Sequence, residues 1–497
     1  MGIVFRQSLK ASIVSYFGTG IGAFSVIFLF PKCLTAEQIG LTRVLLEAAM
    51  FFSFFSQLGA SNITLKFFPY FRDYSKNHNG FFLIISSLPL IGFLIFLILY
   101  ISFRTTLVQP FIEKSKLLTD YYLYIIPLTF FCVYIAISEA YSSMLLRIVV
   151  PRIVKEVFVR IFLVFITLLL FFKILDIHEY VFLFVLIYGL AFLMDILYIN
   201  KIQPISFKPN FSFLNKPLIK EMGLFMLYMI IAGSGSSIAN KIDIGMITSK
   251  ISLSGTGIYS IAFFVAAFIE VPTRSIFQIT TPFAIEALKN NEHEKLDSLY
   301  KRVALNQFVI AGFLFLLIWI NVNNLYKIMP HGDLYSTGKY VIFFIGLSKV
   351  FDAATGINAS ILNYSKYYYY TLYFIFILAA LAFFNNLVFI KMYGITGAAI
   401  ATAISIFLYN LILVIFVKLK LKTHPISFKT LIVLVIFIII FYINTLIPNF
   451  HNAFIDAAIR SIIISGLFSF LILKFKISSD INLTIHNLWN KYILNKS

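Results

Sequence analysis

The sequence predicts an all-α protein that crosses a membrane about fourteen times, as two similar six-helix lobes followed by two further C-terminal helices. Three observations predict this fold class. Of the 497 residues, 60% are hydrophobic and 12% are charged, about half the charged fraction of an ordinary soluble domain. Apolar runs of about 20 residues, long enough to cross the ~30 Å hydrocarbon core, recur along the whole chain. The chain also repeats itself at a shift of 217 residues.

We interpret each apolar run as one membrane-spanning helix, because backbone groups in lipid must be bonded within their own segment. The runs are too long and too uniformly apolar for the strands of a membrane barrel. The first run lacks the small-residue exit of a signal peptide, so it is counted as a span. The expected spans are 10–30, 39–60, 80–103, 119–143, 153–172, 178–200, 219–240, 256–281, 302–321, 336–360, 367–390, 395–417, 429–446 and 454–473.

The net charge of +19 belongs mostly to the short connectors between these runs. In a membrane protein, Lys and Arg in connectors orient the spans and contact anionic lipid headgroups, so nucleic acid is not an expected partner. With the N-terminus in the cytoplasm, the connectors on that side carry about twice as many Lys and Arg as those on the other side. The positive-inside rule then predicts that both termini are cytoplasmic.

Nothing in the sequence indicates a cofactor or a metal. Cys33 and Cys132 lie far apart, without metal-type spacing around either one, which predicts neither a disulfide framework nor a metal site. The sequence has no Walker motif, so the chain itself is not expected to consume ATP. Coupling to a Na⁺ or H⁺ gradient stays open.

An internal repeat relates the two halves of the chain. LTAEQIGLTR at 34–43 aligns with ISLSGTGIYS at 251–260, which places Gly40 over Gly257. Because the shift covers six crossings, an even number, the two copies point the same way, as in a parallel repeat about an axis along the membrane normal. Two further alignments lie in the same order along the chain. SSMLL (142–146) aligns with ASILN (359–363) at the same shift, and PYFRDYSKNH (69–78) aligns with PFAIEALKNN (282–291) at a shift of 213.

The repeat predicts a domain organisation and a class of function. The expected divisions are an N-terminal six-helix lobe at 1–205, a second lobe at 206–422, and two extra helices with a cytoplasmic tail at 423–497. Two homologous lobes of this kind place a substrate path between them and permit rocking between inward-open and outward-open states. The sequence therefore indicates a transporter.

Two N-terminal stretches, SLKASIVSYFGTGIGAFSVIFLFPKCLTAEQIGLTRVL and LGASNITLKFFPYFR, resemble the opening of bacterial polysaccharide flippases (Wzx-like) of the multidrug, oligosaccharidyl-lipid and polysaccharide (MOP) exporter superfamily. The resemblance lies in an amphipathic first helix, an L-T-x-E-x-I-G turn into the second helix, and a Pro-aromatic exit. It implies a MATE-like fold and a non-enzymatic transporter in the bacterial cytoplasmic membrane.

The implied activity is the flipping of polyprenyl-diphosphate-linked oligosaccharide repeat units to the periplasmic leaflet, for O-antigen (lipopolysaccharide) or exopolysaccharide biosynthesis. The implied partners are this lipid-linked oligosaccharide, membrane lipids and polysaccharide-assembly proteins.

Glu270 and Arg274 lie inside an expected span, in the stretch FIEVPTRSIF. A charge at mid-membrane costs on the order of 2.5 to 3.5 kcal/mol on the insertion scale, so such residues face protein or water. The i, i+4 spacing puts both on one helix face, where they can form a self-neutralised structural pair. The alternative is functional: Arg274 contacts the diphosphate, and Glu270 tunes or releases it. In the resembling family this span lines the central cavity, which favours the functional alternative.

Two more charged pairs have the same two interpretations. Lys349 and Asp352 are spaced i, i+3, and Arg43 and Glu47 are spaced i, i+4. Arg43 and Lys66 can also reach polar zones by snorkelling. Arg43, Lys66 and Lys349 are thus candidate substrate contacts, and Glu47 and Asp352 are candidate coupling or gating residues.

Lys241 and Asp243 follow the small-residue patch AGSGSSIAN at 232–240, where helices can approach closely or unwind. Packing is the default interpretation. The alternative is a cation or sugar site with Lys241 as a substrate contact and Asp243 as a gating residue. Glu139 has no local partner in its span. It is a proton or cation coupling residue, or it is hydrogen-bonded to a neighbouring helix, or it is protonated.

Two other features are expected to be structural. Asp456 and Arg460, spaced i, i+4, lie in the C-terminal helices outside the two-lobe core. The run SKYYYY at 365–370 is expected to form an aromatic belt at the membrane interface rather than a platform for sugars.

Three other functions stay open. An ion-coupled drug or metabolite antiporter of the same superfamily needs a more apolar or acidic cavity, whereas Arg274 and Lys349 suit an anionic ligand. A membrane glycosyltransferase or polymerase is an enzyme with catalytic residues in long outward loops, and no outward connector here is long. A scaffold without transport is opposed only by the buried charges.

Overall fold

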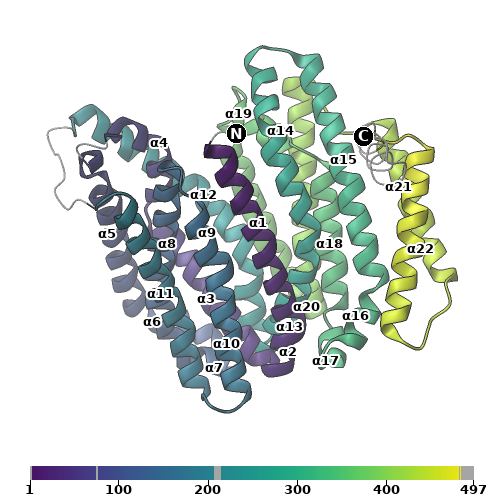
Figure 1. Ribbon diagram of the computed structural model, residues 1–497, viewed down its shortest axis with the longest axis horizontal. Coiled ribbons are helices and arrows are strands. Elements are labelled where there is room, and N and C mark those ends of the chain that lie inside the picture. Colours follow the sequence, from purple (N-terminus) through teal and green to yellow (C-terminus); the bar gives the residue numbers. More distant parts are fainter. Residues whose placement is uncertain (1–2, 74–76, 206–213, 479, 481, 483–497) are drawn as a thin grey trace. The chain divides into compact units, whose positions relative to one another are not determined.

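The structure is a computed structural model that describes residues 3–73, 77–205, 214–478, 480 and 482 (Figure 1). The chain divides into two compact units, Met1–Ser260 (unit 1) and Ile261–Ser497 (unit 2). The division into lobes at 205/206 stays a prediction, and residue 206 lies outside the described residues, as does the end of the expected cytoplasmic tail. The regular elements of the described residues are helices, as the sequence predicts.

Unit 1 is built from long helices joined by short helical turns. Most of its helices run side by side (Figure 1). In chain order they are α1 (Ile3–Phe24), η1 (Ser25–Leu29), α2 (Phe30–Cys33), α3 (Ala36–Ser56), α4 (Ala60–Phe71), η2 (Asn77–Gly80), α5 (Phe81–Ser102), α6 (Arg104–Val108), η3 (Gln109–Phe111), α7 (Lys116–Tyr121), η4 (Tyr122–Tyr124), α8 (Ile125–Met144), α9 (Val149–Ile153), η5 (Val154–Phe158), α10 (Val159–Phe171), α11 (Ile177–Ile202) and α12 (Lys216–Lys250).

The division between the units falls inside α13 (Leu253–Ala267). Unit 2 then continues with helices of similar length. They are η6 (Phe268–Glu270), α14 (Val271–Lys289), α15 (His293–Ile320), α16 (Val322–Ile328), α17 (Gly332–Ser336), α18 (Lys339–Ala354), α19 (Asn358–Tyr364), α20 (Tyr370–Leu421), α21 (Phe428–Leu446) and α22 (Ala453–Lys474).

The helices confirm a multi-pass membrane protein. Within the described residues, 11 helices are long and apolar enough to cross a membrane, and a bent pair, α18 with α19, makes up to 12. The bend of 50° falls in the expected span 336–360. The expected span 153–172 falls on α9, the π-helical turn η5 and α10, and α10 alone has only 13 residues. The count of fourteen spans stays a prediction.

The 52-residue α20 is two helices that fold back on each other. Asn385 Nδ2 donates a hydrogen bond to Ser405 Oγ at 3.0 Å, although 20 residues of unbroken helix would extend for about 30 Å. The reversal occurs at Gly394, whose φ of 58° and ψ of −134° are strained for any residue with a Cβ. The expected spans 367–390 and 395–417 therefore correspond to the two arms of this hairpin.

In unit 1, α3 and α13 cross through two glycines. A Cβ at Gly40 would collide with the carbonyl oxygen of Leu253, and a Cβ at Gly257 would collide with that of Ala36. Each of these residues lies 217 positions from its counterpart in the internal repeat. The crossing holds the first turns of both helices backbone to backbone, and Thr35 fixes the start of α3 with a capping box to Gln38.

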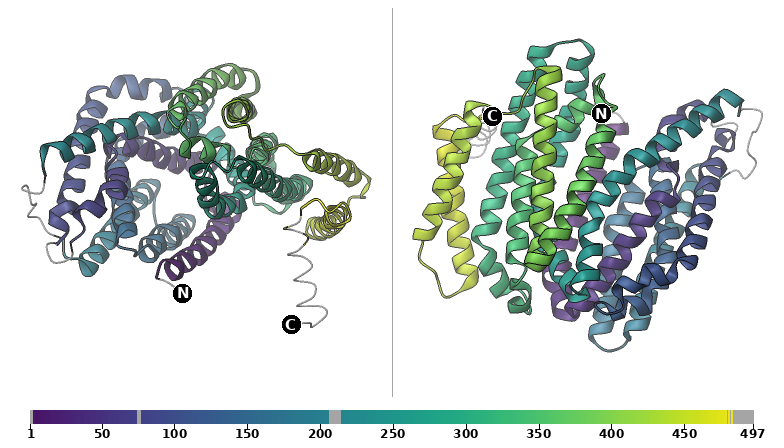
Figure 2. Two further views of the ribbon diagram at one scale, coloured as in Figure 1. Left: turned by 90° about the horizontal axis from the view of Figure 1, so that it is seen from above. Right: turned by 180° about the vertical axis from the view of Figure 1, so that it is seen from behind.

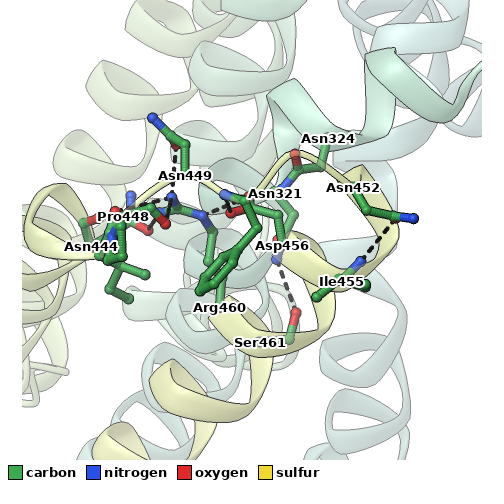
Figure 3. A network of polar contacts seen from close by, with 12 residues as sticks. Asn321, Asn324, Asn444, Pro448, Asn449, Asn452, Ile455, Asp456, Arg460 and Ser461 are labelled. Carbon is green, nitrogen blue, oxygen red and sulfur yellow. Dashed lines mark hydrogen bonds and ion pairs between the residues drawn. The ribbon is translucent and has the colours of Figure 1, made fainter.

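The two C-terminal helices α21 and α22 lie against each other and against α15 in unit 2 (Figure 2). Phe437 and Phe468 stack at a centroid distance of 5.8 Å, and buried aliphatic side chains from all three helices surround them. Figure 3 shows the polar network that fixes the turn between α21 and α22. Arg460 is its centre, as expected for a structural residue: it bonds Asp456 at 2.8 Å and the carbonyl oxygens of Ile447 and Pro448 at 3.1 Å each.

Candidate functional site

A buried charge cluster in unit 1 joins α3 to α12. Arg43 forms the expected i, i+4 ion pair with Glu47, at 2.6 Å between Nη2 and Oε1. The other carboxylate oxygen of Glu47 pairs with Lys241, which the sequence places 194 residues further on. The Glu47 side chain is only 7% exposed. A single buried carboxylate therefore pairs with two partly buried cations.

Asp243 and Tyr259 extend this region of unit 1. The Tyr259 hydroxyl donates to Asp243 Oδ2 at 2.8 Å, and both side chains are buried. Tyr259 belongs to α13, two residues beyond the Gly257 crossing. The small-residue patch before Lys241 is helical throughout, as part of α12, so it is not unwound. Within it, a Cβ at Gly233 would collide with the ring of Phe54 of α3.

A pocket of about 380 Å³ lies beside the Glu47 cluster. Its wall is mostly apolar, with Val44, Phe52 and Tyr100 among the lining side chains, and Glu47 and Lys241 are its charged members. Because Glu47 already neutralises two cations, its carboxylate is not free to bind a cationic ligand.

The central group in unit 2 is Glu270. Its Oε1 accepts from Arg274 Nε at 3.0 Å, as the spacing predicts, and its Oε2 pairs with Lys349 Nζ at 2.6 Å. The sequence pairs Lys349 with Asp352 on its own helix, whereas the structure pairs it with Glu270 of η6. The Arg274 side chain is 69% exposed, and its terminal nitrogens donate to none of the residues that the structure describes.

Asp352 belongs instead to a polar network that crosses α18, α19 and α20. Its Oδ1 accepts from Asn410 Nδ2 at 2.9 Å. Asn410 Oδ1 in turn accepts from Thr355 at 3.1 Å and from Asn358 at 2.9 Å. The network lies at the bend between α18 and α19, where Gly356 has a positive φ of 61°. Its role is thus at least structural, since it ties a broken span to the α20 hairpin.

Two other predicted site residues have partners outside their own helix. Lys66 pairs with Glu221 of α12 at 3.1 Å and lies 4.4 Å from the ring centroid of Phe225. Glu139 of α8, for which the sequence offered no local partner, pairs with Lys155 of η5 at 2.8 Å. The structure therefore places both residues in ion pairs within unit 1.

Sequence reasoning missed three polar residues that the structure makes prominent: Lys155, Asp195 and Asn410. Asp195 is the most unusual, because it is fully buried and neither carboxylate oxygen has a hydrogen-bond partner among the described residues. A signal was present in the sequence: Asp195 is a lone charge within the apolar run LAFLMDILYI, as Glu139 is in its own span.

The two charge clusters have a shared chemistry. In each, one carboxylate pairs with two cations, so each group keeps a surplus positive charge. In unit 2, one of those cations, Arg274, is largely exposed, and its terminal nitrogens donate to none of the described residues. Guanidinium groups with free donors bind phosphate oxygens through short, charge-assisted hydrogen bonds. The unit 2 cluster is therefore suited to an anionic ligand.

No family model matches the chain, and no curated protein matches it. The fold is nevertheless shared with solved membrane transporters. The lipid II flippase MurJ, in an inward closed conformation, superposes with a TM-score of 0.73 at 15% sequence identity, over 94% of this chain and 99% of its own.

Two MATE transporters match less of the chain. An inward-facing multidrug resistance MATE family transporter of the MOP superfamily gives a TM-score of 0.62 at 13% identity, over 82% of this chain and 94% of its own. A point mutant of the MATE transporter VcmN of Vibrio cholerae superposes with a TM-score of 0.56 at 12% identity, over 85% of this chain and 98% of its own. These likenesses establish the MATE-like fold that the sequence predicted.

Proposed function

We propose that this protein is a flippase that moves polyprenyl-diphosphate-linked oligosaccharide repeat units across the cytoplasmic membrane of a bacterium, for O-antigen or exopolysaccharide biosynthesis, by alternating access. Both termini are cytoplasmic in this proposal. The fold supports a transporter, and the likeness to a lipid flippase extends over 94% of the chain, against 82% for the first MATE transporter. The oligosaccharide and the biosynthetic route come from the sequence resemblance.

The observation that carries the proposal is the pairing of Glu270 with both Arg274 and Lys349. Lys349 alone can keep Glu270 neutralised, because its ammonium lies 2.6 Å from the carboxylate. Arg274 can then exchange Glu270 for the diphosphate of the substrate without leaving a buried charge unpaired. The substrate is released when Arg274 returns to Glu270.

An ion-coupled drug or metabolite antiporter is the second candidate, supported by the two MATE folds. Such a protein needs a pocket that is apolar with a free acidic group when its ligand is a lipophilic cation. The unit 1 pocket is apolar, but its carboxylate, Glu47, is engaged by Arg43 and Lys241. Because Glu47 is already paired with two cations, the pocket favours the flippase over the antiporter. The membrane glycosyltransferase or polymerase has no comparable support, since the solved structures of similar fold are transporters.

The proposal is tested by binding of a polyprenyl diphosphate, without sugar, to purified protein in detergent. Arg274→Ala is expected to weaken binding roughly 10- to 150-fold, since a charge-assisted hydrogen bond contributes about 1.5 to 3 kcal/mol. Lys289→Ala removes an exposed cation from the same helix, α14, and is the matched control with unchanged affinity.

Equal affinity in wild-type protein and Arg274→Ala would overturn the assignment of Arg274. Tight binding of a lipophilic cation, together with no binding of the diphosphate, would favour the antiporter instead.

A further inference from the structure

Asp195 of α11 lies in an unusual position in unit 1. Its side chain is 0% exposed, and both of its carboxylate oxygens lack a hydrogen-bond partner among the described residues. An ionised carboxylate in an apolar interior without donors is strongly disfavoured, whereas the protonated acid carries no charge to neutralise. The buried Asp195 carboxyl is therefore stable only when it binds a proton or gains a cationic partner.

The neighbouring helix α8 supplies a second unsatisfied group at the same level. Phe131 of α8 contacts the position of Gly189, and the ring of Tyr134 lies 5.6 Å from that of Phe192, centroid to centroid, so both contacts join residues 58 positions apart. The same offset brings Asp195 to the level of Ile137, the residue before Ser138. The Ser138 hydroxyl is also buried and without a partner among the described residues.

Two charged groups act on Asp195, namely Glu139 of α8 and Lys155 of η5. They form their own ion pair at 2.8 Å, which leaves no net charge to balance an ionised Asp195. Glu139 and Lys155 are 28% and 44% exposed, whereas Asp195 is fully buried. The third element packed on α11 near this level, α9, contributes Arg152, whose side chain is exposed.

Lys155 is carried by a π-helical turn, Val154–Phe158, between α9 and α10. Such turns widen a helix locally and are frequent at functional sites. Here the turn packs on α11 and carries Lys155, which pairs with Glu139 at 2.8 Å and acts electrostatically on Asp195.

We propose that Asp195, Glu139 and Lys155 form a proton-binding site in unit 1 that couples transport to a proton gradient. With a proton on Asp195, Lys155 pairs with Glu139, as in the structure. When Asp195 releases that proton to water, Lys155 moves from Glu139 to the new carboxylate, and Glu139 is solvated in its partly exposed position. Uptake of one proton from the other side of the membrane restores the first arrangement.

The chemistry of the site favours a proton over Na⁺. A sodium ion needs several oxygen ligands, while the Lys155 ammonium beside Asp195 repels a metal cation at close range. A proton needs only one carboxylate oxygen. The coupling role rests on the proposed transport function, but binding of the proton does not, and the two are measured separately.

Binding is tested by infrared spectroscopy of the purified wild-type protein during a pH titration, without substrate. The expected result is a protonated carboxyl band at neutral pH that disappears as the pH is raised and is absent from Asp195→Asn. Asp120→Asn, which alters an exposed aspartate of α7, should keep the band. Asp195→Glu should restore a protonated carboxyl band, and this variant also serves if Asp195→Asn fails to fold.

Lys155→Gln tests the role of Lys155. Without the ammonium, the negative charge of Glu139 is no longer balanced, and it favours the protonated form of Asp195. The band should persist to higher pH in that variant. An Asp195→Asn spectrum identical to wild type, or loss of the band on adding NaCl at constant pH, would overturn the proton site.

Coupling is tested in proteoliposomes with an imposed pH gradient. The gradient should accelerate flipping by wild-type protein and by Asp120→Asn but not by Asp195→Asn. If no lipid-linked glycan is flipped and the infrared band still belongs to Asp195, the proposed transport function fails and the proton site stands. If Asp195→Asn responds to the gradient as wild type does, the coupling role fails.

Discussion

Gly40 and Gly257 lie backbone to backbone, and each occupies in its own helix the place that the internal repeat assigns to the other. The contact is symmetric: Gly40 meets the carbonyl of Leu253, and Gly257 meets that of Ala36, at the same separation of 217 residues. A local two-fold relation between α3 and α13 follows. This two-fold relation shows that the sequence repeat corresponds to equivalent positions at the start of both helices.

Alanine at either glycine is expected to destabilise the protein by about 1 to 3 kcal/mol, because the added Cβ overlaps a backbone carbonyl that cannot move aside. Gly40→Ala and Gly257→Ala should lower the thermal midpoint in detergent by similar amounts. The double variant should cost less than the sum, since one separation of the helices relieves both overlaps. Gly245→Ala in α12, where a Cβ meets open space, is the control and should not lower the midpoint. A strictly additive double variant would argue against a shared contact.

Glu47→Gln is expected to destabilise unit 1 by on the order of 3 kcal/mol, because Arg43 and Lys241 are left as two partly buried like charges. Lys241→Met in the Glu47→Gln background removes one of these cations and should recover part of the loss. Denaturation of the single and double variants measures the coupling. If Glu47→Gln is as stable as wild type, solvation by water rather than pairing with Glu47 stabilises the two cations.

Asp480 makes the attachment of the segment after α22 dependent on pH. Hydrogen bonding to Arg302 holds the pKa of Asp480 below its ordinary value of 3.8, and Asn306 donates to the same carboxylate at 2.7 Å. Because the folded pKa is lowered, this contribution is present above the ordinary value and is lost as the pH falls through the folded one. It amounts to no more than about 1 kcal/mol, since Arg302 is largely exposed.

Proteolysis of the segment after α22 should accordingly accelerate only in acid, below about pH 4. In Asp480→Asn, cleavage should already be faster at neutral pH and should lose this acid dependence. An acid-tolerant protease is the appropriate probe, with Asp333→Asn, an exposed aspartate of α17, as the control. Unchanged acid dependence in Asp480→Asn would assign the effect to another group.

Arg460→Lys is expected to loosen the turn between α21 and α22, because an ammonium cannot reproduce the fork that bonds Asp456, Asn444 and the carbonyls of the turn (Figure 3). The expected cost is about 3 kcal/mol, as for breaking a buried pair. Hydrogen exchange of residues 444–456 measures it. Exchange as slow as in wild type would contradict a structural role for the guanidinium.

The fold class could be predicted from the sequence because lipid restricts a chain to helices whose length is readable as apolar runs. Ion pairs between residues four positions apart, such as Arg43 with Glu47 and Glu270 with Arg274, can be predicted for the same reason: helical spacing is local. The ion pair between Lys349 and Glu270 cannot be predicted in this way, since it depends on how two helices pack against each other.

The α20 hairpin and the crossing of α3 with α13 illustrate the same limit. The sequence separates the two arms of α20 correctly, but only the structure shows that Gly394 reverses the chain. Gly40 and Gly257 were aligned as equivalent positions, and their direct contact could not be derived from alignment alone. The roles of the candidate site residues in transport stay predictions.

The central claim is tested most directly in proteoliposomes that carry a polyprenyl-diphosphate-linked oligosaccharide, by measuring how much sugar becomes accessible to an impermeant glycosidase. Exposure should depend on the protein, should be lost in Arg274→Ala and should be kept in Lys289→Ala, with equal amounts of folded protein in the membrane. No exposure with any of several lipid-linked glycans, from protein shown to be folded, would contradict it.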